Sequence, residues 1–75
     1  MLMLYMVSSK LAKRLGQNIK RIRIKKQMSQ GDICRKLDMD RGYMSAIENG
    51  KKNITLKVLH KLADALSVTV DRLLK

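Results

Sequence analysis

Positively charged side chains dominate the chemistry that this sequence could carry out. Seventeen lysines and arginines stand against six acidic residues, which gives a formal net charge of +11 at pH 7. Eight of these cations lie between Lys10 and Lys26, and the first acid, Asp32, follows all of them. A balance this basic favours binding to a polyanion, either nucleic acid or an anionic membrane surface. The alternative is a solvated basic surface that binds no partner.

Groups that could catalyse a reaction or hold a metal are sparse. The 75 residues include one cysteine, Cys34, one histidine, His60, and one glutamate, Glu48. A single cysteine excludes an intrachain disulfide and a cysteine-paired zinc site, and it fits a reducing, cytoplasmic location. No Ser/His/Asp set, carboxylate pair, phosphate loop or metal spacing is present. We therefore predict that the protein is not an enzyme, with no catalytic residue, metal, cofactor or small-molecule substrate.

The first seven residues, MLMLYMV, are apolar but too few to span a membrane. We interpret them as an N-terminal extension that packs on the domain or on a partner subunit, or as the product of a start codon assigned too far upstream. The chain has room for one domain. We therefore divide it into residues 1–14, an extension with the start of the first helix, and residues 15–75, the domain.

Capping residues predict five helices and no strand. Ser8 or Ser9 begins the first, which runs to about Lys26. Ser29 and Asp32 form the capping-box pattern of the second. Asp40 caps the third, over about 41–49, Thr55 caps the fourth, over 56–66, and Thr69 caps the fifth, over 70–74. The residues expected to face the core on the fourth helix are Leu56, Leu59, Leu62, Ala63 and Leu66.

The second and third helices are separated by a turn of only a few residues, with Asp38 expected in a left-handed conformation. This spacing is typical of a helix-turn-helix, whose second helix lies in the major groove of DNA. With Met44 and Ile47 turned inward, the residues predicted to read bases are Arg41, Gly42, Tyr43, Ser45 and Ala46.

Arg41 is placed to donate two hydrogen bonds to one guanine, at O6 and N7, which is the commonest specific base contact. Gly42 lets the backbone approach DNA, or is simply tolerated there. Tyr43 contacts thymine methyls or a phosphate, or instead fills the rim of the core. For Arg41 the alternative is an ordinary solvated arginine.

Phosphate contacts are expected on both sides of the reading helix. Gln30 begins the second helix, where free backbone N–H groups favour an anion. The loop after the third helix is basic and polar, and the residues predicted to contact phosphates there are Asn49, Lys51, Lys52 and Asn53. An ordinary solvated loop is the alternative for the lysines.

From Leu15 to Leu74 the sequence resembles the Cro/repressor-like (XRE) helix-turn-helix family. The segments LGQNIKRIR, MSQGDICRKL, MDRGYMSAIENGKKN and LKVLHKLADALSVTVDRLL follow one another in the family's order. The resemblance implies an all-α, five-helix, lambda-repressor-like domain. The stretch DRGYMSAIENGKKNIT is most similar to controller proteins of restriction–modification systems, which are dimeric regulators of their own operon. Phage-type repressors share a similar segment.

The resemblance also implies roles for individual residues. Arg23 would pair with Glu48 and brace the reading helix on the first helix. The family positions that face DNA correspond to Gln30, Arg41, Gly42, Tyr43 and Ala46. Three residues depart from the family pattern: Asp38 replaces the turn glycine, Cys34 replaces an alanine, and Ile54 stands where proline is frequent.

These observations predict a homodimeric transcriptional regulator that binds a palindromic operator in double-stranded DNA. The expected dimer seam is the C-terminal helix, with Val68, Val70, Leu73 and Leu74. One alternative is an antitoxin that binds a toxin and regulates its own operon, although only residues 1–14 are spare for such a partner. The other is a cationic peptide that is helical only on anionic lipid.

Overall fold

Five α-helices make up the part of the chain, residues 9–75, that our computed structural model describes. They are α1 (Ser9–Lys25), α2 (Gln30–Leu37), α3 (Arg41–Glu48), α4 (Leu56–Leu66) and α5 (Val70–Leu74). The predicted all-α class and five helices are confirmed. The expectations for residues 1–7 lie outside the described residues.

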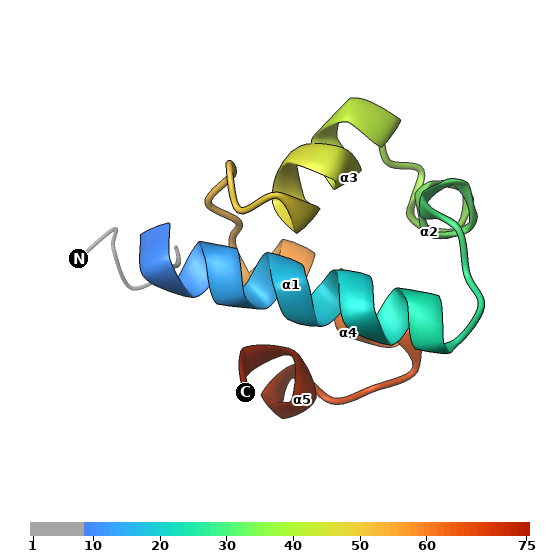
Figure 1. The fold of residues 1–75 in the computed structure, drawn as a ribbon. Coiled ribbons are helices and arrows are strands. Elements are labelled where there is room, and N and C mark those ends of the chain that lie inside the picture. The colour runs from blue at the N-terminus through green and yellow to red at the C-terminus, as the bar shows by residue number, and fades with distance from the viewer. Residues whose placement is uncertain (1–8) are drawn as a thin grey trace.

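Helix α1 runs through the middle of the domain (Figure 1). It contacts α3 on one side and α5 on the opposite side, and α4 packs behind it. Helix α2 packs against both α3 and α4. Helix α3 packs against both α1 and α2, so these two helices determine its position.

Each helix after α1 begins at the predicted capping residue. Ser29 Oγ accepts a hydrogen bond from the Asp32 N–H at 3.0 Å, and the Asp32 carboxylate accepts one from the Ser29 N–H at 2.7 Å. Asp40, Thr55 and Thr69 cap α3, α4 and α5 with one side-chain hydrogen bond each. These bonds satisfy N–H groups that have no partner within their helix, and such a cap is typically worth about 1 kcal/mol.

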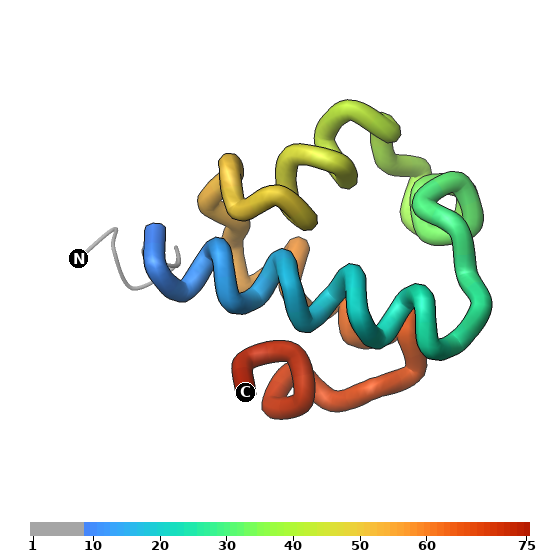
Figure 2. Tube along the Cα trace, viewed as in Figure 1, coloured from blue at the N-terminus to red at the C-terminus, as the bar shows by residue number. Residues whose placement is uncertain are grey.

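The turn between α2 and α3 is as tight as the spacing predicts. Asp38 ends α2 in the left-handed region, with φ 53° and ψ 51°, and the Met39 N–H bonds back to the Cys34 carbonyl at 2.9 Å. Figure 2 shows the short bent segment that connects α2 to α3. An aspartate tolerates this conformation better than most residues, which explains how it can replace glycine.

Apolar side chains from all five helices form one core. The fully buried large residues are Leu15, Ile19, Ile33, Met44, Ile47, Ile54, Leu59, Leu62, Leu66 and Leu73. Ile54 lies in the loop before α4, and its side chain fills the core at a position where proline would supply less apolar volume. Cys34 is buried as a small apolar residue, as expected.

Two predicted orientations are wrong. Leu56, which we expected to face the core, is 47% exposed, because it is the first residue of α4 and packing begins only at Val58 and Leu59. Leu73, which we expected at a dimer seam, is fully buried within the monomer. It is buried because α5 packs against α1, where Asn18 Nδ2 donates to the Leu73 carbonyl at 2.8 Å.

Gly16 marks the closest approach of α1 to α3. A Cβ atom at this position would lie 2.4 Å from the Ile47 carbonyl oxygen and 2.7 Å from that of Glu48. Both neighbours are backbone atoms, so neither can move away without shifting α3. The absence of a side chain at Gly16 is therefore what lets the end of α3 rest on α1.

Replacing Gly16 with alanine is expected to destabilise the domain by about 1–3 kcal/mol, since overpacking at a backbone contact outweighs the gain in helix propensity. Thermal or urea unfolding followed by circular dichroism measures this change. Gln17→Ala, at the exposed neighbouring position of α1, is the control and should leave stability within about 0.5 kcal/mol of the wild type. A Gly16→Ala protein as stable as this control would contradict the close approach.

Candidate nucleic-acid interface

The face of α3 opposite the core is the candidate interface. Met44 and Ile47 are buried at 0% and 2% exposure, which fixes the rotation of the helix. Arg41, Gly42 and Asn49 are exposed on the other side, and Tyr43, Ser45 and Ala46 are half-buried. The structure therefore brings all five predicted base-reading residues to the surface of one short helix.

The N-terminal ends of α2 and α3 share this surface. The Asp40 carboxylate accepts a hydrogen bond from the Tyr43 N–H at 3.1 Å, which fixes the first turn of α3. The Arg41 guanidinium reaches back toward α2, where its Nη1 lies 3.9 Å from the position that a Cβ on Gly31 would occupy. Arg41 is thus an exposed cation at the start of the candidate reading helix.

A buried ion pair ties α3 to α1, as the resemblance implied. Arg23 Nε donates to Glu48 Oε2 at 2.7 Å, and Arg23 Nη2 donates to Glu48 Oε1 at 3.0 Å. The exposed fractions of the two side chains are 11% and 2%. Hydrogen bonding to Glu48 raises the pKa of Arg23 above its usual value, so the guanidinium stays charged.

Two further hydrogen bonds extend this pair into a network. Arg23 Nη1 donates to the Met28 carbonyl at 2.8 Å, and Gln30 Nε2 donates to Glu48 Oε1 at 3.0 Å. Side chains from α1, α2 and α3 therefore meet at the Glu48 carboxylate, while the Met28 carbonyl holds the α1–α2 loop. This network positions the candidate reading helix on its scaffold.

Gln30 is the first residue of α2, the position that the sequence predicts. Its side chain is half-buried and bonded to Glu48. Its backbone N–H still opens the N-terminus of α2, where an anion is favoured. The side chain is thus a positioning group for α3.

The polar loop after α3 is open to solvent. Asn49, Lys51, Lys52 and Asn53 are all exposed, and Gly50 takes a left-handed φ of 71° that ends the helix. The Lys51 N–H bonds to the Ala46 carbonyl at 2.9 Å, which holds the loop against the end of α3. The start of the loop therefore lies beside α3, where Asn49 Nδ2 donates to Ser45 Oγ at 3.5 Å.

Two residues that position the helices were not predicted from the sequence. Gly16 allows the close crossing of α1 and α3, and Asn18 is a buried polar residue that ties α1 to α5. Asn18 lies at helical spacing with Leu11, Leu15 and Ile22, on the apolar stripe of α1. A polar residue on such a stripe indicates a buried side chain with a hydrogen-bond partner. Gly16 in mid-helix was a weaker signal, since a glycine there also occurs by tolerance.

Asp32 couples the cap of α2 to pH. Hydrogen bonds from the backbone and side chain of Ser29, with a smaller contribution from Arg35, hold the pKa of Asp32 below its usual value. A lowered pKa in the folded state stabilises the fold above the unfolded pKa, which is about 3.9 for an aspartate. That stabilisation is lost as the pH falls through the lower, folded-state pKa.

We expect the free energy of unfolding to fall more steeply below about pH 5 in the wild type than in Asp32→Asn. Urea unfolding at a series of pH values measures the two slopes. The difference between the proteins isolates Asp32 from the other aspartates. Parallel curves would show that the cap does not titrate as described.

Residues 9–75 contain no group of three or more histidine, cysteine, aspartate or glutamate side chains able to hold a metal ion. Within the same residues, no helix is both long and apolar enough to cross a bilayer.

The helix-turn-helix family matches residues 19–73, which span all of α2 through α4 and parts of α1 and α5. The chain belongs to this family. It is a helix-turn-helix DNA-binding regulator, as the sequence predicted. The match runs from the middle of the first helix to Leu73 and so includes the α2–turn–α3 unit described above.

Individual relatives of this helix-turn-helix chain are controller proteins. The control protein C.MunI from a Mycoplasma species is 39% identical over 61 residues, which cover 80% of this chain and 82% of the relative. The crystal structure of the restriction–modification controller protein C.AhdI from Aeromonas hydrophila matches with a TM-score of 0.79 at 31% identity, covering 83% and 94% of the two chains. The controller protein C.Esp1396I, solved as a tetramer with its natural 35-base-pair operator, matches with a TM-score of 0.74 at 33% identity, covering 87% and 96%. The predicted likeness to controller proteins is confirmed.

Proposed function

We propose that this helix-turn-helix protein is a transcriptional regulator of the controller type that binds a palindromic operator as a homodimer. The observation that carries the proposal is the exposed face of α3, held rigidly by the Arg23–Glu48 network and bordered by a basic loop. The likeness to C.AhdI and C.Esp1396I supports it, since both are named as restriction–modification controllers. We place the DNA-binding domain in residues 15–75 and its site of action in the cytoplasm, and assign it no catalytic activity.

In this proposal α3 lies in the major groove. Arg41, Gly42, Tyr43, Ser45 and Ala46 contact base edges, with Arg41 as the principal reader of a guanine. The residues that grip phosphates are Asn49, Lys51, Lys52 and Asn53, together with the backbone N–H of Gln30. The two half-sites then lie about 34 Å, or one helical turn, apart.

The dimer seam is proposed at α5, without Leu73. Val70 and Leu74 lie four residues apart on α5, so they share one face of that helix. Both are half-buried and pack only partly against the core, as does Val68. Sedimentation equilibrium of the full chain tests the seam: Leu74→Glu should shift a dimer to monomer. An unchanged dimer would place the seam elsewhere.

Fluorescence anisotropy tests the function with two duplexes of equal length. One carries the region upstream of the protein's own gene, and the other carries a scrambled sequence of the same composition. A specific regulator binds the first at least about a thousandfold more tightly. Equal affinity for the two duplexes would contradict autoregulation by operator binding.

A further inference from the structure

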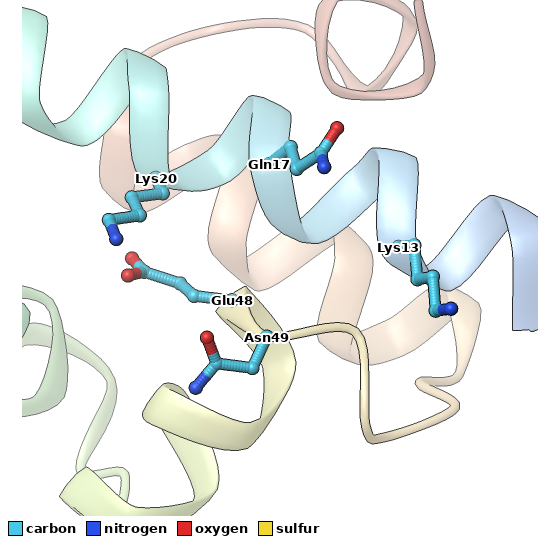
Figure 3. Close-up of a pocket in the computed structure, with 5 residues that line it drawn as sticks. All are labelled: Lys13, Gln17, Lys20, Glu48 and Asn49. Carbon is cyan, nitrogen blue, oxygen red and sulfur yellow. The ribbon is translucent and has the colours of Figure 1, made fainter.

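Two lysines of α1 lie beside the end of α3, outside the residues assigned so far. They help to line a cleft of about 260 Å³ between α1 and the end of α3, formed by Lys13, Gln17, Lys20, Glu48 and Asn49 (Figure 3). Asn49 also bonds to Ser45 on the exposed face of α3. The cleft therefore adjoins the surface that we assign to DNA.

The cleft carries surplus positive charge. Both oxygens of the Glu48 carboxylate accept hydrogen bonds from Arg23, and one accepts a further bond from Gln30, so the charge of Glu48 is already matched. Among residues 9–75, the ion pairs are Arg23–Glu48 and Arg35–Asp32, and neither includes Lys13 or Lys20. The two lysines thus leave the cleft with two positive charges that no carboxylate compensates.

The two lysines are also spaced to follow an extended anion. They lie seven residues apart on α1, which puts them on the same side of the helix and about 10.5 Å apart along its axis. Figure 3 shows Lys13 pointing toward the segment that follows Asn49, and Lys20 pointing toward Glu48. A Cβ on Gly50 would lie 2.8 Å from the Lys13 Cα, so the loop that carries Lys51 and Lys52 packs directly on α1.

The charge pattern of α1 is unfavourable for the helix alone. Its first turn contains no acid, although the positive end of the helix dipole favours one there. The remaining residues of α1 are also free of acids, whereas the exposed positions of α4 mix Lys57 and Lys61 with Asp64. A solvated helix gains from such mixed signs, and like charges at helical spacing destabilise it. An anionic partner would offset this cost in α1.

We propose that the Lys13–Lys20 cleft is a second contact site for the phosphate backbone of the bound duplex, in addition to the loop after α3. The DNA backbone that contacts Lys51 and Lys52 continues past the end of α3 and then contacts α1. Ammonium groups act on phosphate as point charges and carry no sequence information, so the cleft adds affinity without changing the sequence that is read. The inference rests on the proposed function, since it extends the same protein–DNA contact.

Salt dependence of binding tests the proposal, with Lys13→Gln/Lys20→Gln as the variant. The control is Arg14→Gln/Arg21→Gln, which removes the same amount of positive charge from α1. Each of these arginines directly follows one of the two lysines, so its side chain points about 100° away around the helix. All four side chains are exposed and glutamine is a good helix former, so both variants should fold. Affinity for the duplex that carries the region upstream of the protein's own gene and for the scrambled duplex is measured between about 50 and 200 mM salt.

The lysine variant should reduce the slope of log affinity against log salt by nearly 2, at about 0.9 for each lost phosphate contact. It should weaken binding to both duplexes by the same factor. The arginine control should change the slope much less. A lysine variant whose slope matches the wild type, or an equal fall in the control, would overturn the proposal. The first of these results would indicate that the lysines face solvent or an acidic protein.

The same measurements separate this inference from the proposed function. If the wild type bound both duplexes equally, sequence-specific regulation would fail, while the difference in slope between the two variants would still decide whether the cleft contacts phosphate. If the wild type bound the upstream-region duplex preferentially but the lysine variant had an unchanged slope, the function would stand and the cleft would be excluded as a phosphate contact.

Discussion

Glu48→Ala is expected to lower the free energy of unfolding by about 3 kcal/mol or more, because it leaves the Arg23 guanidinium buried without its anion. The same change removes the acceptor of the Gln30 side chain. A domain of this length has roughly 4–11 kcal/mol of stability in total, so the change should remove about a quarter or more of it. Urea unfolding followed by circular dichroism measures the loss.

The exposed pair of Asp32 and Arg35 supplies the control for this prediction. The Arg35 side chain is 74% exposed, so Arg35→Ala should change stability by no more than about 1 kcal/mol. In the double variant Arg23→Met/Glu48→Met, most of the lost stability should return, since apolar residues of similar size can replace a buried pair. A Glu48→Ala protein as stable as the Arg35→Ala control would show that the network does not hold α3.

Arg41→Ala is expected to weaken binding to the operator by about 1–3 kcal/mol and to remove the preference at one base position of each half-site. The reason is that Arg41 is exposed at the start of α3. A guanidinium there can donate two hydrogen bonds to one guanine. Competition binding against duplexes substituted at each position in turn measures both effects.

Lys52→Ala is the matched control for Arg41, because it removes one exposed cation from the loop and leaves α3 unchanged. It should weaken binding to every duplex equally and reduce the salt slope by about 0.9. If Arg41→Ala behaves in the same way, Arg41 is a phosphate contact and its assigned role is wrong.

Local sequence signals predicted the secondary structure of the described residues closely. Each cap is decided by a side chain within three residues of the N–H that it binds, as at Ser29 with Asp32, so short-range spacing suffices. The inward rotation of α3 was also predictable, because Met44 and Ile47 are three residues apart on a helix whose other positions are mostly small or polar.

Features that depend on how the helices meet were less predictable. The burial of Leu73 follows from the docking of α5 on α1, and the exposure of Leu56 follows from where the packing of α4 begins. Gln30 forms its bond to Glu48 across 18 positions of sequence, and only the packing of α2 beside α3 brings the two together. Gly16 is required by two backbone carbonyls of α3, which no pattern within α1 reveals.

The family match and the site geometry make separate contributions to the functional conclusion. The match assigns the chain to DNA-binding regulators, and the structure supplies a surface on which α3, the basic loop and the Lys13–Lys20 cleft adjoin. The buried network holds the eight-residue α3 in place, because Arg23 of α1 and Gln30 of α2 both donate hydrogen bonds to Glu48 at its end.

Selection of bound sites from a random-sequence DNA library tests the central claim most directly. The full-length protein should enrich a palindromic motif whose half-sites are centred about 10–10.5 base pairs apart, each containing a guanine whose preference is lost in Arg41→Ala. A library that stays unenriched after repeated rounds, while the protein remains folded, would contradict sequence-specific binding through α3.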